Sequence, residues 1–433
     1  MSQKNRLHFW QIWNMSFGFL GVQYAFGLQQ ANMSPIYRYL GADESQIPWL
    51  WLAGPVTGLI IQPIIGSMSD RTWHKRWGRR RPYFMVGALL TSVALVLMPQ
   101  STELWMAASL LWLLDAAANI TMEPFRALIA DKLPDEQRSI GYAMQSFFVG
   151  LGQTLANVMP LVLTAIGIST VAVTGSAQEI PDFVRYSFFI GAGAILFSIA
   201  VTVLTTSEKK PAHLEASTGK RKIVDFKELV EAFKDMPKAM RELWWVKFFT
   251  WFGLPLMWQY LALSLSRHSF HAPTPDSPGF EEGVKWANLG LAVFNVLCFL
   301  FSLILPALTK KLQAKKTHAL ALGIGGIGFI SMLFTDDPYM TMWCMALVGI
   351  AWASIMSIPY VMLSTSVPEN RMGVYMGIFN MFIVIPQIIN MITIPFIYNN
   401  LLSGDPRHAL VLAGICLILA GIASLRVKLE KAV

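Results

Sequence analysis

The sequence predicts an all-α integral membrane protein with twelve transmembrane helices, and three observations support this prediction. Only 14% of the 433 residues are charged and 54% are hydrophobic, against about 25% and 45–50% in soluble domains. The hydrophobic residues form blocks long enough to cross about 30 Å of hydrocarbon as helices. The segments that join these blocks carry Lys and Arg very unevenly.

Twelve blocks are expected to form the spans. The first six lie near residues 9–30, 47–68, 83–100, 103–130, 139–168 and 184–206. After a polar stretch, the other six lie near 243–265, 285–309, 318–335, 340–366, 372–400 and 408–425. A helix suits each block because it satisfies its own backbone hydrogen bonds in lipid.

The distribution of Lys and Arg predicts the orientation. With the N-terminus inside, 27 of the 34 Lys and Arg residues lie in inner segments, as the positive-inside rule requires. The outer segments hold Arg38, Arg185, Arg267, Lys285 and Arg407. We therefore expect a multi-pass protein of the inner or plasma membrane with both termini in the cytoplasm. The net charge of +8 reflects this topology and does not indicate nucleic-acid binding.

The chain is expected to consist of two pseudo-symmetric six-helix halves. We assign residues 1–206 to the first half, 207–242 to a cytoplasmic linker with an amphipathic helix, and 243–433 to the second half. Pro124 and Pro359 both fall late in the fourth span of their half. Gln153 and Gln387 match in the next spans. Such duplicated halves are typical of secondary transporters.

The fourth span carries charged residues, which are costly inside hydrocarbon and usually functional. At 100° per residue, Asn119 and Arg126 lie within about 40° of Asp115 on the same helix face. Asp115 lies near mid-depth, where a change in its surroundings would bind or release a proton. Glu123 lies one turn from Arg126, and both an ion pair and a role in coupling stay open for it.

Amide side chains are spread over many spans of both halves. Amides both donate and accept hydrogen bonds, so they suit a neutral ligand rich in hydroxyls, although each could also join helices. Several Trp side chains in these helices could flank a sugar ring. The candidate binding residues are Gln23, Gln29, Gln62, Gln145, Asn119, Asn295, Asn380, Gln387, Trp112, Trp251 and Trp258. Lys247, at the start of its span, is expected to extend to water.

Several segments of the first half carry a family resemblance. The loop after the second span reads GSMSDR from Gly66 to Arg71, then GRRRP from Gly78 to Pro82. It resembles the signature loop of the major facilitator superfamily in the lengthened form of sucrose transporters. GVQYAFGLQ (21–29), WLAGPVTGLIIQPIIGSMSDR (51–71) and LLDAAANITMEPFRALIAD (113–131) are similar to plant sucrose–proton symporters. The resemblance is weaker in the second half.

This resemblance implies a major facilitator fold and uptake of a disaccharide, an α-glucoside such as sucrose or maltose, together with a proton. It places the proton-binding aspartate on Asp115, its neighbouring asparagine on Asn119 and the essential arginine on Arg126. The cytoplasmic gate would use Asp70, Arg71, Gly78, Arg79, Arg80, Glu136, Arg138, Glu369 and Arg371. The seventh span departs from the plant pattern because it has no acidic residue.

Other functions fit the sequence less well. A sodium symporter of the melibiose type would hold acidic residues on its second and fourth spans, and the second span here has none. A membrane enzyme would need an acid–base or metal cluster, and the seven His residues lack ligand spacing. A proton-independent facilitator or an exporter stays open. We expect a monomer in the lipid bilayer, without cofactor or metal.

Overall fold

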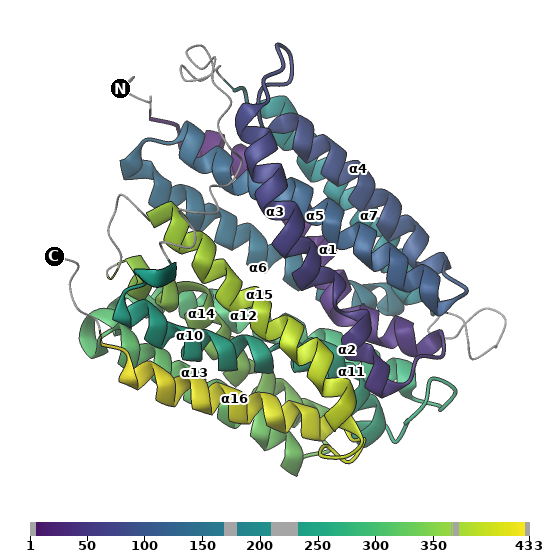
Figure 1. The fold of residues 1–433 in the computed structure, drawn as a ribbon. Coiled ribbons are helices and arrows are strands. Elements are labelled where there is room, and N and C mark those ends of the chain that lie inside the picture. Colours follow the sequence, from purple (N-terminus) through teal and green to yellow (C-terminus); the bar gives the residue numbers. More distant parts are fainter. Residues whose placement is uncertain (1–5, 169–179, 209–232, 365, 367–371, 429–433) are drawn as a thin grey trace. The chain divides into compact units, whose positions relative to one another are not determined.

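The computed structural model describes residues 6–168, 180–208, 233–364, 366 and 372–428. Throughout these ranges the regular structure is helical (Figure 1). Ten helical stretches in them are long and apolar enough to cross a membrane. Helix α1 and the pair α10–α11 are two further rods, so the expectation of twelve spans in an all-α fold is confirmed.

The chain forms two compact units. Unit 1 comprises Met1–Ile36 and Val56–Ile223. Its helices are α1 (Phe9–Tyr39), α3 (Ala53–Arg71), α4 (Arg81–Leu97), α5 (Leu104–Lys132), α6 (Asp135–Ala165) and α7 (Asp182–Thr205). The last turn of α1 already belongs to unit 2. Between α4 and α5 lies the short 3-10 helix η2 (Met98–Gln100).

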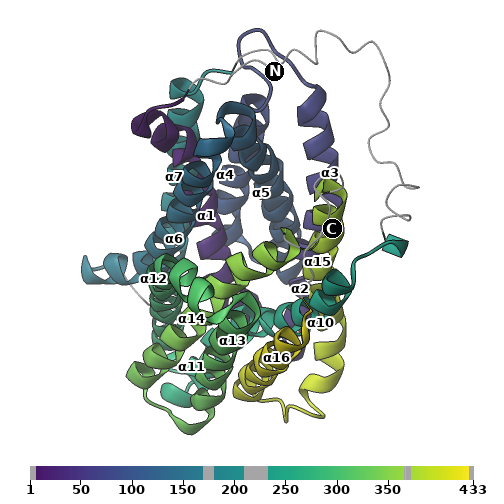
Figure 2. The same ribbon diagram turned by 90° about the vertical axis from the view of Figure 1, so that its left-hand side faces the viewer.

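Unit 2 comprises Val224–Val433 together with the segment Tyr37–Pro55. That segment contains η1 (Glu44–Gln46) and α2 (Ile47–Leu50), both of which pack against α15. The other helices are α10 (Lys238–Gly253), α11 (Pro255–Ser269), α12 (Phe280–Leu312), α13 (Ala314–Ser331), α14 (Pro338–Ser364), α15 (Met372–Tyr398) and α16 (Pro406–Arg426). A 3-10 turn, η3 (Met332–Phe334), follows α13. Within this unit α13 packs against α14 and α16, as Figures 1 and 2 show.

The expected seventh span, 243–265, is divided into two helices. Helix α10 ends at Gly253 and α11 begins at Pro255, because a proline has no N–H with which to continue the helical hydrogen-bond ladder. The amphipathic helix predicted in the linker lies mostly at 209–232, outside the described residues.

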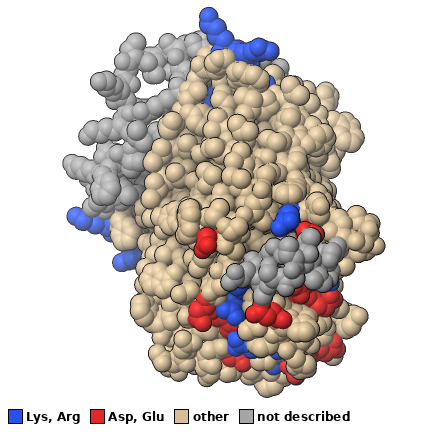
Figure 3. Space-filling model, turned by 90° about the vertical axis from the view of Figure 1, so that its right-hand side faces the viewer, with Lys and Arg blue, Asp and Glu red and all other residues tan. Residues whose placement is uncertain are grey.

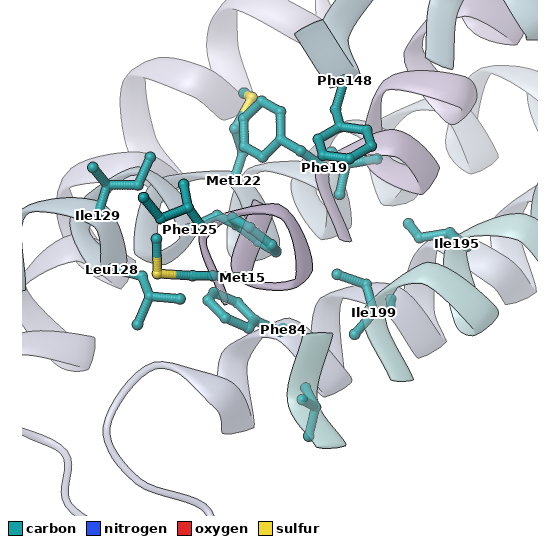
Figure 4. Close-up of a cluster of buried hydrophobic side chains, with 14 of the residues drawn as sticks. Met15, Phe19, Phe84, Met122, Phe125, Leu128, Ile129, Phe148, Ile195 and Ile199 are labelled. Carbon is teal, nitrogen blue, oxygen red and sulfur yellow. The ribbon is translucent and has the colours of Figure 1, made fainter. Parts of the chain in front are cut away.

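The core of unit 1 is an aromatic and aliphatic cluster (Figure 4). The Phe125 ring of α5 stacks on Phe84 of α4, with ring centroids 4.4 Å apart, and meets Phe19 of α1 edge-on at 5.3 Å. Ile195 and Ile199 of α7 complete the contact. In lipid this interdigitation holds helices together through packing, because no hydrophobic effect acts between apolar surfaces already outside water.

Glycines let two pairs of these helices approach closely. A Cβ on Gly21 of α1 would lie 2.2 Å from Ser198 Oγ and 2.4 Å from Ile195 Cα of α7. A Cβ on Gly87 of α4 would lie 2.0 Å from Thr121 Oγ1 of α5. Small residues at such crossings are the usual means of close packing between membrane helices. Gly21 in the GVQYAFGLQ segment thus has a structural role.

The exterior fits a lipid environment. Most of the surface on the face shown in Figure 3 consists of uncharged side chains. Leu89, Val93, Phe197 and Leu204 on α4 and α7 are among the exposed large hydrophobic residues. Exposure of such side chains to lipid hydrocarbon has little cost, whereas exposure of so many of them to water is unfavourable.

We expect Gly21→Ala to destabilise unit 1. The added methyl group would overlap the α7 backbone, so α1 must move, at a cost of about 1–3 kcal/mol. The measurement is the thermal unfolding midpoint of the purified protein in detergent. Gly193→Ala on α7 is the matched control, because a Cβ there meets nothing within 4 Å. Equal midpoints for the two variants would contradict the role of Gly21.

Candidate functional site

A buried carboxyl lies at the centre of the polar residues of unit 1. The Asp115 side chain on α5 is 1% exposed. Gln29 of α1 donates a hydrogen bond from Nε2 to Asp115 Oδ1 over 2.9 Å. Asp115 Oδ2 is also buried and has no hydrogen-bond partner among the described residues. One oxygen of this acid is therefore held, and the other is open to a proton.

A second polar contact lies one turn further along α5. Gln62 of α3 donates from Nε2 to Asn119 Oδ1 over 2.7 Å, and Asn119 Nδ2 donates to Thr57 Oγ1 of α3 over 3.3 Å. Three helices of unit 1 thus contribute to one group, the α5 polar cluster, composed of Gln29, Asp115, Asn119, Gln62 and Thr57. The structure brings together four of the predicted site residues here.

The other candidate residues of unit 1 lie outside the α5 polar cluster. Gln153 of α6 donates from Nε2 to Gln23 Oε1 of α1 over 2.9 Å, and Gln145 bonds the Phe125 carbonyl over 3.2 Å. These two bonds join helices. Trp112 remains 42% exposed. The exposed Arg126 side chain contacts the Met122 sulfur at 3.7 Å, and the Glu123 side chain lies outside the described residues.

In unit 2 the predicted tryptophans form an aromatic group. Trp251 of α10 and Trp258 of α11 both meet Trp352 of α14 edge-on, with ring centroids 5.8 and 6.0 Å apart. Phe294 of α12 joins Trp352 at 5.8 Å. The buried Trp251 Nε1 has no hydrogen-bond partner in the described part of the chain. An indole N–H in this state is a donor available to a ligand.

The amides of unit 2 are less closely grouped. Asn295 is buried and bonds the Leu291 carbonyl of its own helix over 2.9 Å, while Asn380 and Gln387 are half-buried. A pair that was not among the candidates is more connected. Gln259 Nε2 of α11 lies 3.3 Å from Asn390 Oδ1 of α15. Asn390 Nδ2 donates to the Phe252 carbonyl over 2.7 Å, beside the break between α10 and α11.

The signature loop is anchored within unit 1 by its arginines. Arg80 Nε donates to Asp131 Oδ2 of α5 over 2.9 Å, and Arg79 Nε donates to the Ser69 carbonyl over 3.1 Å. Both arginines are buried. The side chains of the other predicted gate residues lie outside the described residues, namely Asp70, Arg71, Glu136, Arg138, Glu369 and Arg371.

Glu208, just after α7, was not predicted and holds this loop from the other side. Its carboxylate accepts hydrogen bonds from the backbone N–H groups of Arg79, Arg80 and Arg81, at 3.0 to 3.2 Å. A carboxylate is well placed there because α4 begins at Arg81 and a helix N-terminus favours negative charge. Gly78 has φ +75°, and a Cβ on it would lie 2.9 Å from Glu208 Oε1.

We expect Glu208→Gln to loosen the signature loop. An amide has one acceptor oxygen in place of two and loses the charge, so the loss is about 1–2 kcal/mol. Hydrogen exchange at the amides of residues 79–81 should accelerate by roughly 5- to 30-fold, the equivalent of that free energy. Glu103→Gln is the control, because Glu103 precedes α5 and makes no side-chain cap. Unchanged exchange in Glu208→Gln would refute the anchoring role.

The five cations of the predicted outer segments each have an acidic partner in their own unit. Arg185 lies 3.4 Å from Asp182, Arg407 lies 2.6 Å from Asp336, and Lys285 pairs with Glu282. Arg38 and Arg267 both contact Glu44, at 3.8 and 2.7 Å. Each of these cations therefore has a carboxylate close enough to offset its charge.

Glu44 attaches the segment Tyr37–Pro55 to the rest of unit 2. It is buried, and both of its carboxylate oxygens accept from Arg267 Nη2, at 2.7 and 2.8 Å. Tyr398 of α15 donates to Glu44 Oε2 over 2.6 Å, and Tyr260 of α11 donates to the Glu44 carbonyl over 3.2 Å. One residue from the connection between α1 and α3 therefore joins α11 and α15.

A second acid of these segments caps α16. Asp405 accepts from the Arg407 backbone N–H over 2.8 Å and lies 2.8 Å from His268 Nε2. Burial raises the pKa of Asp405, but the hydrogen bonds from His268 and Arg407 outweigh it and hold the pKa at about 2. A depressed carboxyl pKa adds stability above the unfolded value near 3.9, which is lost as pH falls toward 2.

We expect Glu44→Gln to lower the unfolding free energy by about 1–3 kcal/mol. Removing one member of a buried pair costs about 3–5 kcal/mol, and exposure of 27% for Arg267 reduces this value. Thermal unfolding in detergent measures the change. Asp182→Asn is the control, because it removes the partner of Arg185, whose side chain is 34% exposed, so it should stay near wild type. If Glu44→Gln has the same unfolding midpoint as the control variant, Glu44 does not stabilise the attachment of the segment Tyr37–Pro55.

Comparisons with known proteins place these features in context. The model of the Major Facilitator Superfamily matches residues 15–391 of the chain. The chain is 25% identical over 434 residues to Sucrose transport protein SUT5 of Oryza sativa subsp. indica, an alignment that covers 86% of this chain and 79% of the relative. It is 24% identical over 310 residues to the General alpha-glucoside permease of Schizosaccharomyces pombe, covering 67% of this chain and 54% of the relative.

Among solved structures, the crystal structure of a point mutant of the nucleoside transporter NupG is similar in fold. The TM-score is 0.73 at 13% sequence identity, and the match covers 96% of this chain and 98% of that one. Such low identity supports the architecture and carries no information about substrate.

Proposed function

Because the chain belongs to the Major Facilitator Superfamily, we propose that it is a symporter that imports a disaccharide with a proton by alternating access. The substrate would be an α-glucoside such as sucrose or maltose. The proposed place of action is the inner or plasma membrane, with both termini in the cytoplasm, and the acting form is a monomer without a cofactor. The observation that carries the proposal is the state of Asp115.

The proton site of the proposal is Asp115. An ionised carboxylate with an unpaired oxygen in a buried position is costly, whereas the protonated acid has no net charge to desolvate. Gln29 holds one oxygen, which orients the other without neutralising it. If water reaches Asp115 from alternating sides during the transport cycle, the proton is taken up on one side and released on the other.

The sugar site of the proposal uses the amides near this acid. Gln29 is hydrogen-bonded to Asp115, and Gln62 is hydrogen-bonded to Asn119 one turn further along α5. They offer donors and acceptors to hydroxyl groups, and a bound hydroxyl that displaced one of these bonds would alter the surroundings of Asp115. That exchange couples sugar binding to protonation. Within unit 2, the Trp251 N–H is proposed as a separate donor to sugar.

The relatives support the substrate class. The rice relative is named a sucrose transport protein and the yeast relative a general α-glucoside permease. Both names describe sugars with an α-glucosyl unit. In the proposed cycle Arg79 and Arg80 close the cytoplasmic side through the signature loop, together with Gly78.

We expect Asp115→Asn to abolish proton-driven accumulation of the sugar while exchange of labelled for unlabelled sugar continues. Asparagine keeps the shape and the bond from Gln29 to an oxygen but cannot take up a proton. The measurement is uptake and sugar-induced alkalinisation outside proteoliposomes, with sucrose, maltose, trehalose and monosaccharides. Asp182→Asn is the control, because Asp182 is an acid of the same unit paired with Arg185 outside the polar cluster.

Accumulation at the wild-type level by Asp115→Asn would overturn the proton site. If wild-type protein moves sugar without any movement of protons, the chain is a facilitator. If sugar leaves loaded vesicles against its gradient when the interior is alkaline, it is an exporter. Transport of none of the four sugar types would reject the substrate class.

A further inference from the structure

Lys247 of α10 lies in an unexpected place. Its position at the start of the seventh span suggested that it extends to water, and this prediction is wrong. The side chain is 1% exposed. Its Nζ has no hydrogen-bond partner among the described residues. An ammonium has three N–H donors, and here none of the three has a hydrogen-bond acceptor among the described residues.

Aromatic rings surround the Lys247 amine. Nζ lies 4.8 Å from the ring centroid of Tyr360 on α14, 4.8 Å from that of Phe379 on α15, and 5.8 Å from that of Trp251 on α10. We call these three side chains the Lys247 cage. All three distances are within the range of cation–π attraction, about 6 Å to the centroid.

No carboxylate in the described part of unit 2 pairs with Lys247. The titratable groups that face it are the Tyr360 phenol and, from α13, His318, with which it interacts electrostatically. His318 is fully buried; its Nδ1 contacts Ser354 Oγ over 2.6 Å, and its Nε2 has no partner among the described residues.

Several other titratable groups on the helices that pack against α10 are engaged elsewhere. On α10 itself, Glu242 accepts from the Lys428 backbone N–H. On α11 and α15, Arg267 and Tyr398 hold Glu44, and Tyr375 donates to the Asp235 carbonyl. On α16, Arg407 pairs with Asp336. The balance of charge at Lys247 is therefore set by its cage and His318.

Two opposed effects act on the amine. Burial without hydrogen bonds favours the neutral form, since an unpaired charge in a low-dielectric interior is costly. The ring faces of the cage favour the ammonium, because their negative quadrupole attracts a cation. A methionine or leucine would fill this space without the cost, and ionisable groups within membranes are usually functional. The site is thus arranged so that a modest change in the cage decides whether the proton stays.

We propose that Lys247 is a second proton-binding group of the transport cycle, in the half that has no acid in its seventh span. When the cage is open to the outer side the amine takes up a proton from water, and when it is open to the inner side the ammonium releases that proton to water, with the N–H electron pair remaining on Nζ. Trp251 belongs both to the cage and to the tryptophan group of the proposed sugar site. Sugar bound at Trp251 keeps the cage closed during the inward step, and departure of the sugar on the inner side opens it.

The inference rests on the proposed symport and makes the proton number two per sugar. Asp115→Asn still loses all proton-driven accumulation, because a variant limited to sugar exchange completes no net cycle and moves neither proton.

The test compares Lys247→Met and Lys247→Arg with wild type. In proteoliposomes, the number of protons moved per sugar is expected to fall by about one in both variants. Met cannot bind a proton and Arg does not release one. Sugar exchange should continue in both. Arg at the wild-type ratio with Met reduced would mean that a fixed cation is needed, and wild-type ratios in both would mean that Lys247 only fills space. Either result overturns the inference.

A measurement on the wild-type protein covers the case in which a variant fails to fold. Cyanate modifies neutral amines, so carbamylation of Lys247, read by mass spectrometry, reports the uncaged neutral form. Turnover with sugar and a pH gradient is expected to increase its rate several-fold over idle protein, and an unchanged rate would overturn the inference. Lys132, which bonds the Ser207 carbonyl in unit 1, is the internal control. If wild type moves sugar without protons, the proposed symport itself fails.

Discussion

Hydrocarbon offers no hydrogen bonds, and this constraint explains most of what the structure does with its polar residues. Many polar side chains that enter the apolar helices bond their own helix, as Asn295 does with the Leu291 carbonyl. Others join two helices, as Gln153 and Gln23 do. The exceptions are therefore informative. Asp115 Oδ2 and Lys247 Nζ are buried without a partner in the described chain, and this cost is the reason we propose a function for each.

Acidic residues at helix ends organise both units in a similar way. Glu208 holds the loop before α4 through three backbone N–H groups, and Glu44 attaches the Tyr37–Pro55 segment to α11 and α15. In each case one carboxylate satisfies several donors that would otherwise be buried unpaired. Arg80 and Arg267 are thereby held in defined positions.

The candidate site was predictable to different extents. Asp115 stood out because a charge in the middle of an apolar block is rare, and its helix partner Asn119 followed from the 100° periodicity. The bond from Gln29 and the contact of Gln62 with Asn119 required the arrangement of α1, α3 and α5. The prediction that the Lys247 side chain extends to water was wrong, because the position of a residue within an apolar block indicates only its depth in the membrane, whereas its burial depends on the neighbouring helices.

The sequence by itself determined the twelve apolar rods, the expected orientation, the family resemblance and the importance of the fourth span. These properties depend on composition and helical period, which are local along the chain. The tertiary structure decided that Glu208 closes the signature loop, that Glu44 binds Arg267 across more than 200 positions of sequence, and that three rings enclose Lys247. Contacts between residues so far apart in the chain depend on which helix faces pack together, and the hydropathy pattern does not predict that pairing.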